Sequence, residues 1–189
     1  MASGPAGALL VAALLLTTAC RGRATERATG RASRPTAGDT TAWATNLHDL
    51  DAADSVVLER TLCYGSCPAY RLAVARSGAV RFESRNPQDS GRAAADSVDP
   101  RGFGDIMTDA LFVAFLDLPD RIADDERMCG PSSTDAPTAI VTLYLPGGRR
   151  KRVEDYQGCH WAPWQLHALE DRIDSVAGSA RWVRPARWP

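Results

Sequence analysis

Four cysteines lie beyond residue 46 of this 189-residue chain, and their spacing constrains the fold more than any other feature of the sequence. They are Cys63, Cys67, Cys129 and Cys159. An even number of cysteines in an exported domain indicates disulfides, and four cysteines allow three pairings. We favour Cys63–Cys67 with Cys129–Cys159, because the first pair is local and Gly65 permits the tight turn that it requires. The second bridge would then hold a long polar loop to the start of the last helix.

Zinc binding and redox catalysis are two other interpretations of the same cysteines. With His160 nearby, the cysteines would supply three or four ligands, but structural zinc sites prefer a cysteine pair at both ends, and only Cys63 and Cys67 form one. Thioredoxin-like enzymes place Cys-x-x-Cys at the start of a helix, whereas this spacing is one residue longer and its flanks are predicted strands. We therefore expect structural disulfides, with no metal and no cofactor.

The N-terminus carries an uninterrupted apolar run, GALLVAALLL at residues 7–16. A helix of this length would cross only about half of a membrane's hydrocarbon core, so a secretory signal peptide is predicted rather than a spanning helix. The small residues from Thr17 to Ala19, followed by Cys20, resemble the signal of bacterial lipoproteins, in which the cysteine thiol receives a diacylglycerol and becomes the new N-terminus. No Lys or Arg precedes the run, and Thr17 stands where lipoproteins usually carry Leu, so plain secretion after cleavage at Ala19 is the alternative.

The rest of the chain divides into a tether and one domain. Residues 1–19 are the predicted signal peptide, residues 20–46 a flexible, lipid-anchored tether, and residues 47–189 the domain. The tether has one large apolar residue, Trp43, so it cannot bury enough surface to offset its chain entropy. The formal net charge of -1 argues against a nucleic-acid partner, which normally requires a basic surface. We expect an exported protein of the cell envelope, lipid-anchored to a membrane or secreted.

Hydrophobic periodicity predicts the elements of the domain. Apolar residues alternate with small or polar ones in several segments, and this pattern is typical of strands. Asp99 and Pro100 are typical of a helix start and are followed by apolar residues at helical spacing, and a second helix is predicted from about Pro163. The predicted strands are residues 55–62, 70–75, 80–83, 139–145 and 149–156. This order predicts an α+β fold, a single domain with an antiparallel sheet built from β-hairpins and two helices packed on one face.

The segment at residues 63–70, CYGSCPAY, resembles the signature of a family of bacterial exported domains of unknown function. Members of that family share Cys-x-Gly-x-Cys-Pro-x-Tyr between two strands, and weaker matches extend the resemblance from Val56 to Val183. Cys129 and Cys159 lie outside the family pattern, which supports their pairing with each other. The resemblance implies this architecture and export, but it brings no activity, substrate or catalytic residue.

No catalytic residue is assigned, because the sequence contains no Gly-x-Ser-x-Gly elbow, phosphate-binding glycine loop or His-Glu-x-x-His motif. Several aromatic residues and one aspartate near the predicted loop ends are candidates for contact with a ligand. They are Tyr64, Tyr70, Asp135, Tyr156, Trp161 and Trp164. The alternatives are that the aromatic residues fill the gap between sheet and helix and that Asp135 caps a turn.

Together these features predict a non-catalytic binding or scaffolding domain. Its expected partners are a membrane, through the N-terminal lipid, and an unknown envelope protein, peptide or glycan. The alternative hypothesis is an envelope thiol–disulfide redox factor, or another enzyme, that uses Cys63 and Cys67. Replacing these cysteines would cost a binding domain only stability, whereas a redox factor would keep its fold and lose thiol–disulfide exchange.

Overall fold

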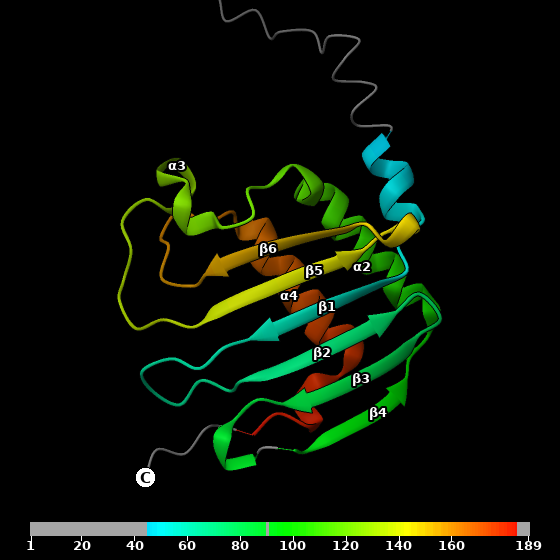
Figure 1. Cartoon of the computed structure of the whole chain (residues 1–189), viewed down its shortest axis with the longest axis horizontal. Coiled ribbons are helices and arrows are strands. Elements are labelled where there is room, and N and C mark those ends of the chain that lie inside the picture. Colours follow the sequence, from blue (N-terminus) through cyan, green and yellow to red (C-terminus); the bar gives the residue numbers. More distant parts are fainter. Residues whose placement is uncertain (1–44, 90, 185–189) are drawn as a thin grey trace, which may run out of the picture. The chain divides into compact units, whose positions relative to one another are not determined.

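The computed structural model describes residues 45–89 and 91–184, which contain nearly all of the expected domain (Figure 1). The predicted signal peptide, Cys20 and the tether up to residue 44 lie outside the described residues. Within the two described ranges, no helix has both the length and the apolar character needed to cross a membrane.

A six-stranded antiparallel sheet organises the domain (Figure 1). The strands are β1 (Ser55–Arg60), β2 (Tyr70–Ala75), β3 (Ala79–Ser84), β4 (Ala93–Ser97), β5 (Thr138–Tyr144) and β6 (Arg150–Tyr156). Their spatial order is β4-β3-β2-β1-β5-β6, and every neighbouring pair is antiparallel. Strands that are consecutive in the chain therefore pair with each other, and the β1–β5 pairing joins the two halves of the sheet.

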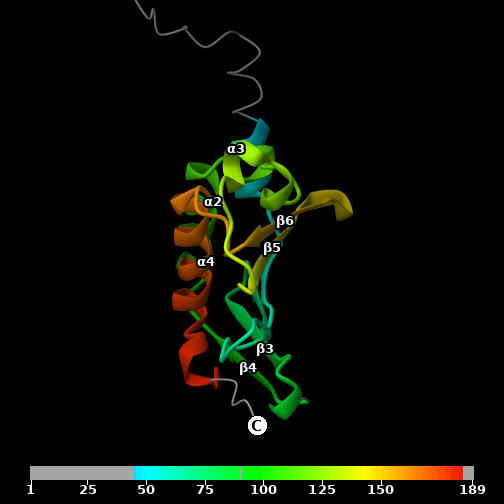
Figure 2. The same cartoon turned by 90° about the vertical axis from the view of Figure 1, so that its left-hand side faces the viewer.

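Two helices, α2 (Pro100–Phe112) and α4 (Trp164–Ala177), pack against each other on one face of the sheet (Figure 2). Asp99 caps α2 as predicted, because its carboxylate accepts a hydrogen bond of 2.9 Å from the amide of Arg101. The expected fold class, an α+β domain with an antiparallel sheet and two helices on one face, is confirmed.

Shorter elements complete the described chain. Residues 45–51 are helical, and α3 (Glu126–Cys129) forms a single turn in the long loop before β5. Five segments form 3₁₀ helices: Pro87–Asp89, Phe115–Asp117, Ile122–Asp124, Pro146–Gly148 and Ser179–Arg181.

The core lies between the sheet and the two long helices. Tyr70, Leu72 and Val74 of β2 are buried and alternate with partly exposed residues, so one side of the strand faces the helices. The helices contribute buried stripes, which are Phe103, Ile106, Met107 and Ala110 from α2 and Leu166, Leu169, Glu170, Ile173 and Ala177 from α4. A charged residue, Glu170, thus lies among the apolar residues of α4.

The edge strand β4 was not expected from the sequence. Its residues, Ala-Ala-Ala-Asp-Ser, lack the β-branched and aromatic side chains that favour strands. Pairing with β3 determines its conformation instead, from Ala93 opposite Glu83 to Ser97 opposite Ala79. The hydrogen bonds of the sheet thus outweigh the weak local propensity of these alanines.

Candidate functional site

Three loops meet at one end of the sheet (Figure 1). Because neighbouring strands are antiparallel, the end of β1, the start of β5 and the end of β6 lie side by side. Segments 61–69, 130–137 and 157–161 extend from these strand ends, and we call them together the loop cluster.

Backbone hydrogen bonds join the segments of the loop cluster. The amide of Tyr64 donates to the carbonyl of Asp135 (3.1 Å), and the amide of Ser133 donates to the carbonyl of Gly158 (2.9 Å). Glycine at position 158 permits the second approach, because a Cβ atom there would collide with the Ser133 carbonyl and with the ring of Tyr156. The cluster is therefore a connected structure and not a set of independent loops.

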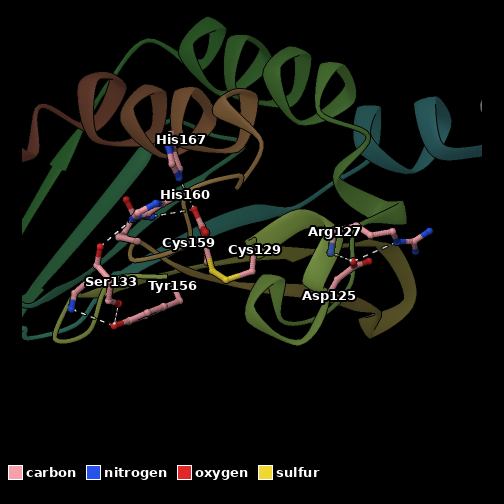
Figure 3. Close-up of a disulfide and its surroundings, with 11 residues drawn as sticks. Asp125, Arg127, Cys129, Ser133, Tyr156, Cys159, His160 and His167 are labelled. Carbon is pink, nitrogen blue, oxygen red and sulfur yellow. Dashed lines mark hydrogen bonds and ion pairs between the residues drawn. A yellow bond between two sulfur atoms is a disulfide. The ribbon is translucent and has the colours of Figure 1, made fainter. Parts of the chain in front are cut away.

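Two disulfides hold the loop cluster, and the Cys129–Cys159 bridge is drawn in Figure 3. The Cα atoms are 5.6 Å apart in Cys63–Cys67 and 4.4 Å apart in Cys129–Cys159, so the structure forms the pairing that the sequence favoured. The second pair is buried, whereas the first is partly exposed. Segment 61–69 contains no helix, so Cys63 and Cys67 do not occupy the helix start that lowers a thiol pKa in thioredoxin-like enzymes.

Tyr156 and Asp135 are used within the loop cluster itself. The Tyr156 hydroxyl donates to the carbonyl of Ser133 (2.8 Å) and accepts from the amide of Ala136 (3.2 Å). Asp135 has a positive φ of 65°, and its carboxylate accepts a hydrogen bond from Thr134 Oγ1 (3.0 Å), as expected of a turn residue. Both residues stabilise the loop before β5.

Ser133 and His160 form a polar pair on the surface of the loop cluster. Ser133 Oγ and His160 Nε2 are 3.0 Å apart and share a hydrogen bond (Figure 3). The side chains come from the segments before β5 and after β6, and both residues are exposed. Ser133 lies two residues before Asp135 and His160 lies four residues after Tyr156 in the chain, so the pair belongs to the same part of the cluster.

Large aromatic rings are exposed where α2 ends and α4 begins. Trp161 and Trp164 are 63% and 66% exposed, and the ring of Trp164 contacts that of Phe112 edge-on at 6.5 Å. The ring of Trp161 lies so close to Gly130 that a Cβ atom at position 130 would collide with it. We call Phe112, Trp161 and Trp164 the aromatic surface. Phe112 is the last residue of α2 and is 71% exposed.

The candidate contact residues Tyr64 and Tyr70 have opposite environments. Tyr64 is 84% exposed in the cysteine loop, whereas Tyr70 is buried on β2. The Tyr70 hydroxyl donates to Asp174 (2.7 Å) and accepts from Arg60 (3.1 Å). Burial, followed by the negative charge of Asp174, raises the pKa of Tyr70 above its ordinary value. Tyr70 therefore packs between the sheet and the helix, and we leave it out of the aromatic surface.

A buried pair of carboxyl groups, Asp155 of β6 and Glu170 of α4, lies beneath α4. Each residue is 1% exposed, and one oxygen of each carboxyl group, Asp155 Oδ1 and Glu170 Oε1, is buried without a hydrogen-bond partner among the described residues. Burial, and then the neighbouring Asp155, raises the pKa of Glu170 from 4.5 to about 9, although Arg60 opposes the rise. We call these two residues the buried acid pair and infer that Glu170 is the protonated member at neutral pH.

Polar side chains surround the buried acid pair. Gln157 Nε2 donates to Asp155 (2.9 Å) and to Glu170 (3.2 Å), and Arg60 lies 3.5 Å from Glu170. His167 Nε2 lies 2.9 Å from Asp155, and this hydrogen bond raises the pKa of His167 above 6.5 although partial burial opposes it. The pair is therefore linked to solvent through the half-exposed ring of His167.

The sequence contained a signal for the buried acid pair that its apolar pattern obscured. Glu170 follows Leu166 by four residues and precedes Ile173 by three, which places it on the buried stripe of α4. Asp155 lies two residues after Val153 and therefore on the same, buried side of β6. A search for apolar residues at helical or strand spacing does not reveal a charged residue at such a position.

The site has no metal-binding arrangement in the ranges 45–89 and 91–184, where no group of three or more His, Cys, Asp or Glu side chains could hold a metal ion. Its exposed components are rigid aromatic rings on a disulfide-linked framework. Such rings provide a large contact area at a small cost in side-chain entropy. The geometry is suited to binding a partner through surface contact.

The comparison with family models assigns the domain to a family. The model described as "Domain of unknown function (DUF6438)" matches residues 54–177. The chain belongs to this family. The match runs from the residue before β1 to the end of α4, so the DUF6438 domain includes both disulfides, the aromatic surface and the buried acid pair. The comparison with curated proteins finds no match. The resemblance to a family of domains of unknown function is thereby confirmed, and export stays a prediction.

Proposed function

We propose that the protein is an exported envelope protein, anchored through lipid on Cys20, whose DUF6438 domain binds a partner without catalysing a reaction. The observation that carries the binding function is the aromatic surface, because three large rings from two neighbouring parts of the fold are each more than 60% exposed. Exposed tryptophans that are held in place are typical of the central residues of binding interfaces. The partner is an envelope protein, peptide or glycan.

The disulfides support the proposed compartment. Structural disulfides form and persist in oxidising environments outside the cytoplasm. The DUF6438 domain has two of them, and the bridge between Cys129 and Cys159 is buried, as a permanent structural link would be. The apolar run at residues 7–16 and the small residues before Cys20 also support export from the cytoplasm.

Photo-crosslinking from the aromatic surface tests this proposal. We expect a photoreactive phenylalanine analogue at position 164 of the full chain, expressed in its native host, to give one adduct of defined mass. Adding Trp161→Ala should lower the yield by about 5-fold or more, as loss of a central interface residue does. The matched control carries the analogue at Tyr144, an exposed position at the opposite end of β5. The proposal is wrong if no adduct forms, or if both positions give the same adducts.

A further inference from the structure

A groove lies at the end of the sheet opposite the loop cluster. The helical residues 45–51 precede β1, whereas the cysteine loop follows it, so the two features occupy opposite ends of the same strand. The groove runs between residues 45–51 and α2, and its volume is about 440 Å³. That volume falls within the usual range of small-molecule sites, about 300–1,000 Å³.

The walls of the groove are mostly apolar. Apolar side chains from both helical segments form them, mostly buried or partly buried, although Leu47 is exposed. The apolar lining residues are Leu47, Leu50, Phe103, Met107 and Leu111. An elongated apolar ligand would therefore contact side chains from both sides.

Gly104 on α2 keeps the groove open. A Cβ atom at this position would meet no other atom within 4 Å, so the space above it is empty among the described residues. Glycine inside a helix costs about 1 kcal/mol relative to alanine. By contrast, a Cβ atom at Gly102 would collide with Val176 of α4, so close packing accounts for that glycine. Close packing does not account for Gly104.

The charged residues of the groove favour an anion. Arg76 and Arg101 line it with one acidic residue, Asp51. The Arg76 guanidinium is held 5.7 Å from the centre of the Phe103 ring, its Nε donates to the carbonyl of Ala53 (2.8 Å) and its Nη2 donates to the carbonyl of Asp51, so its charge is fixed beside the groove. Arg101 has no side-chain hydrogen bond or ion pair to any residue that the structure describes, so its charge is available at the start of α2. A negative head group is also favoured near a helix N-terminus.

We propose that this groove binds a single-chain amphiphile with a carboxylate head, such as a medium-chain fatty acid. The acyl chain lies over Gly104 between Leu50 and Met107, and the carboxylate pairs with Arg101 and Arg76. This inference is independent of the partner proposed for the aromatic surface, because the two sites share no residue. Binding is non-covalent.

Fluorescence titration of the mature full-length protein with cis-parinaric acid tests the groove. We expect saturable binding of one molecule per chain and displacement by dodecanoate. Dodecanol, which has the same chain without the charge, should displace the probe at least about 5-fold less well, since it cannot form the charge-assisted hydrogen bonds to arginine. Equal displacement by dodecanol and dodecanoate, or the absence of saturable binding, would overturn the proposal.

Three single substitutions test whether the fatty acid binds in this groove. A Cβ atom at position 104 meets nothing within 4 Å and leucine favours the helix, so Gly104→Leu should fold, and its side chain should occupy the groove and weaken binding about 10-fold or more. Arg101→Glu should weaken binding about 5-fold or more by placing a like charge at the head group. Arg81→Glu on β3, outside the groove, is the matched control and should leave binding unchanged. Binding that survives Gly104→Leu, or that is seen only with phospholipid vesicles, would contradict a fatty-acid site here.

Discussion

Replacing Glu170 with Gln should remove most of the pH dependence of the free energy of unfolding between about pH 5 and pH 8. The pKa of Glu170 is raised by burial to about 9, from an ordinary value of 4.5. The folded state therefore binds the proton more tightly than the unfolded state, so stability falls as pH rises between these two values. The slope is at most about 1.4 kcal/mol per pH unit, and we expect the wild-type protein to lose about 2–4 kcal/mol from pH 5 to pH 8.

Glutamine at position 170 imitates the protonated acid. Its amide can donate to Asp155 as the carboxylic acid does, and it has no proton to lose. We expect Glu170→Gln to be more stable than the wild type at pH 8, as measured by urea unfolding at several pH values. A small residual slope above pH 6.5 should persist, because the pKa of His167 is also raised and its stabilising contribution fades as the imidazole loses its proton.

The matched control for this prediction is Asp171→Asn. Asp171 is the next residue of α4 and also lies near Arg60 (3.4 Å), but its side chain is 82% exposed. An exposed ion pair contributes at most about 1 kcal/mol, so the pH profile of this variant should follow the wild type. A Glu170→Gln profile as steep as that of the wild type would show that the buried acid pair does not hold a proton in this range.

Removing the Cys129–Cys159 disulfide should cost more stability than removing Cys63–Cys67. The Cys129–Cys159 bridge joins residues 30 apart, whereas the Cys63–Cys67 bridge joins residues 4 apart. Loop entropy in the unfolded chain then predicts a loss of about 3–4 kcal/mol for Cys129→Ala with Cys159→Ala, against about 2 kcal/mol for Cys63→Ala with Cys67→Ala. The first double variant also leaves a gap, because both of its cysteines are buried in the core.

Chemical unfolding without reductant measures both double variants under the same conditions. Double alanine variants leave neither partner of the removed bridge as an unpaired thiol. We expect Cys129→Ala/Cys159→Ala to have the lower free energy of unfolding of the two. An equal or smaller loss for this variant would contradict the expectation that the longer loop stabilises more.

Much of the fold could be predicted from the sequence, because a strand or helix that is buried on one side has apolar residues at a regular spacing. The alternation in residues 70–75 predicted β2 with its inward side chains, and Asp99-Pro100 predicted the start of α2. The edge strand β4 could not be found in this way, since three successive alanines have no alternation and little strand propensity. Its conformation depends on the pairing with β3, which is a tertiary property.

The candidate site was predicted less completely. Tyr64 and Tyr70 both belong to the segment at residues 63–70, yet one is exposed and the other is buried. Tyr70 lies two residues before Leu72 and therefore on the same side of β2, which already indicated that its ring points inward. Phe112 contacts Trp164 of α4, and the raised pKa of Glu170 depends on its burial and then on Asp155 from a different element. Local sequence contains neither of these contacts.

The central claim is that this is an exported, lipid-anchored protein whose cysteines form structural disulfides. An intact-mass measurement of the mature protein, alkylated before and after unfolding without reduction, tests it most directly. We predict an N-terminus at Cys20 bearing a diacylglyceryl group, and no label on Cys63, Cys67, Cys129 or Cys159 in either state. A chain that retains residues 1–19, four labelled cysteines after unfolding, or label on Cys63 and Cys67 in the native protein would contradict it, the last in favour of redox chemistry.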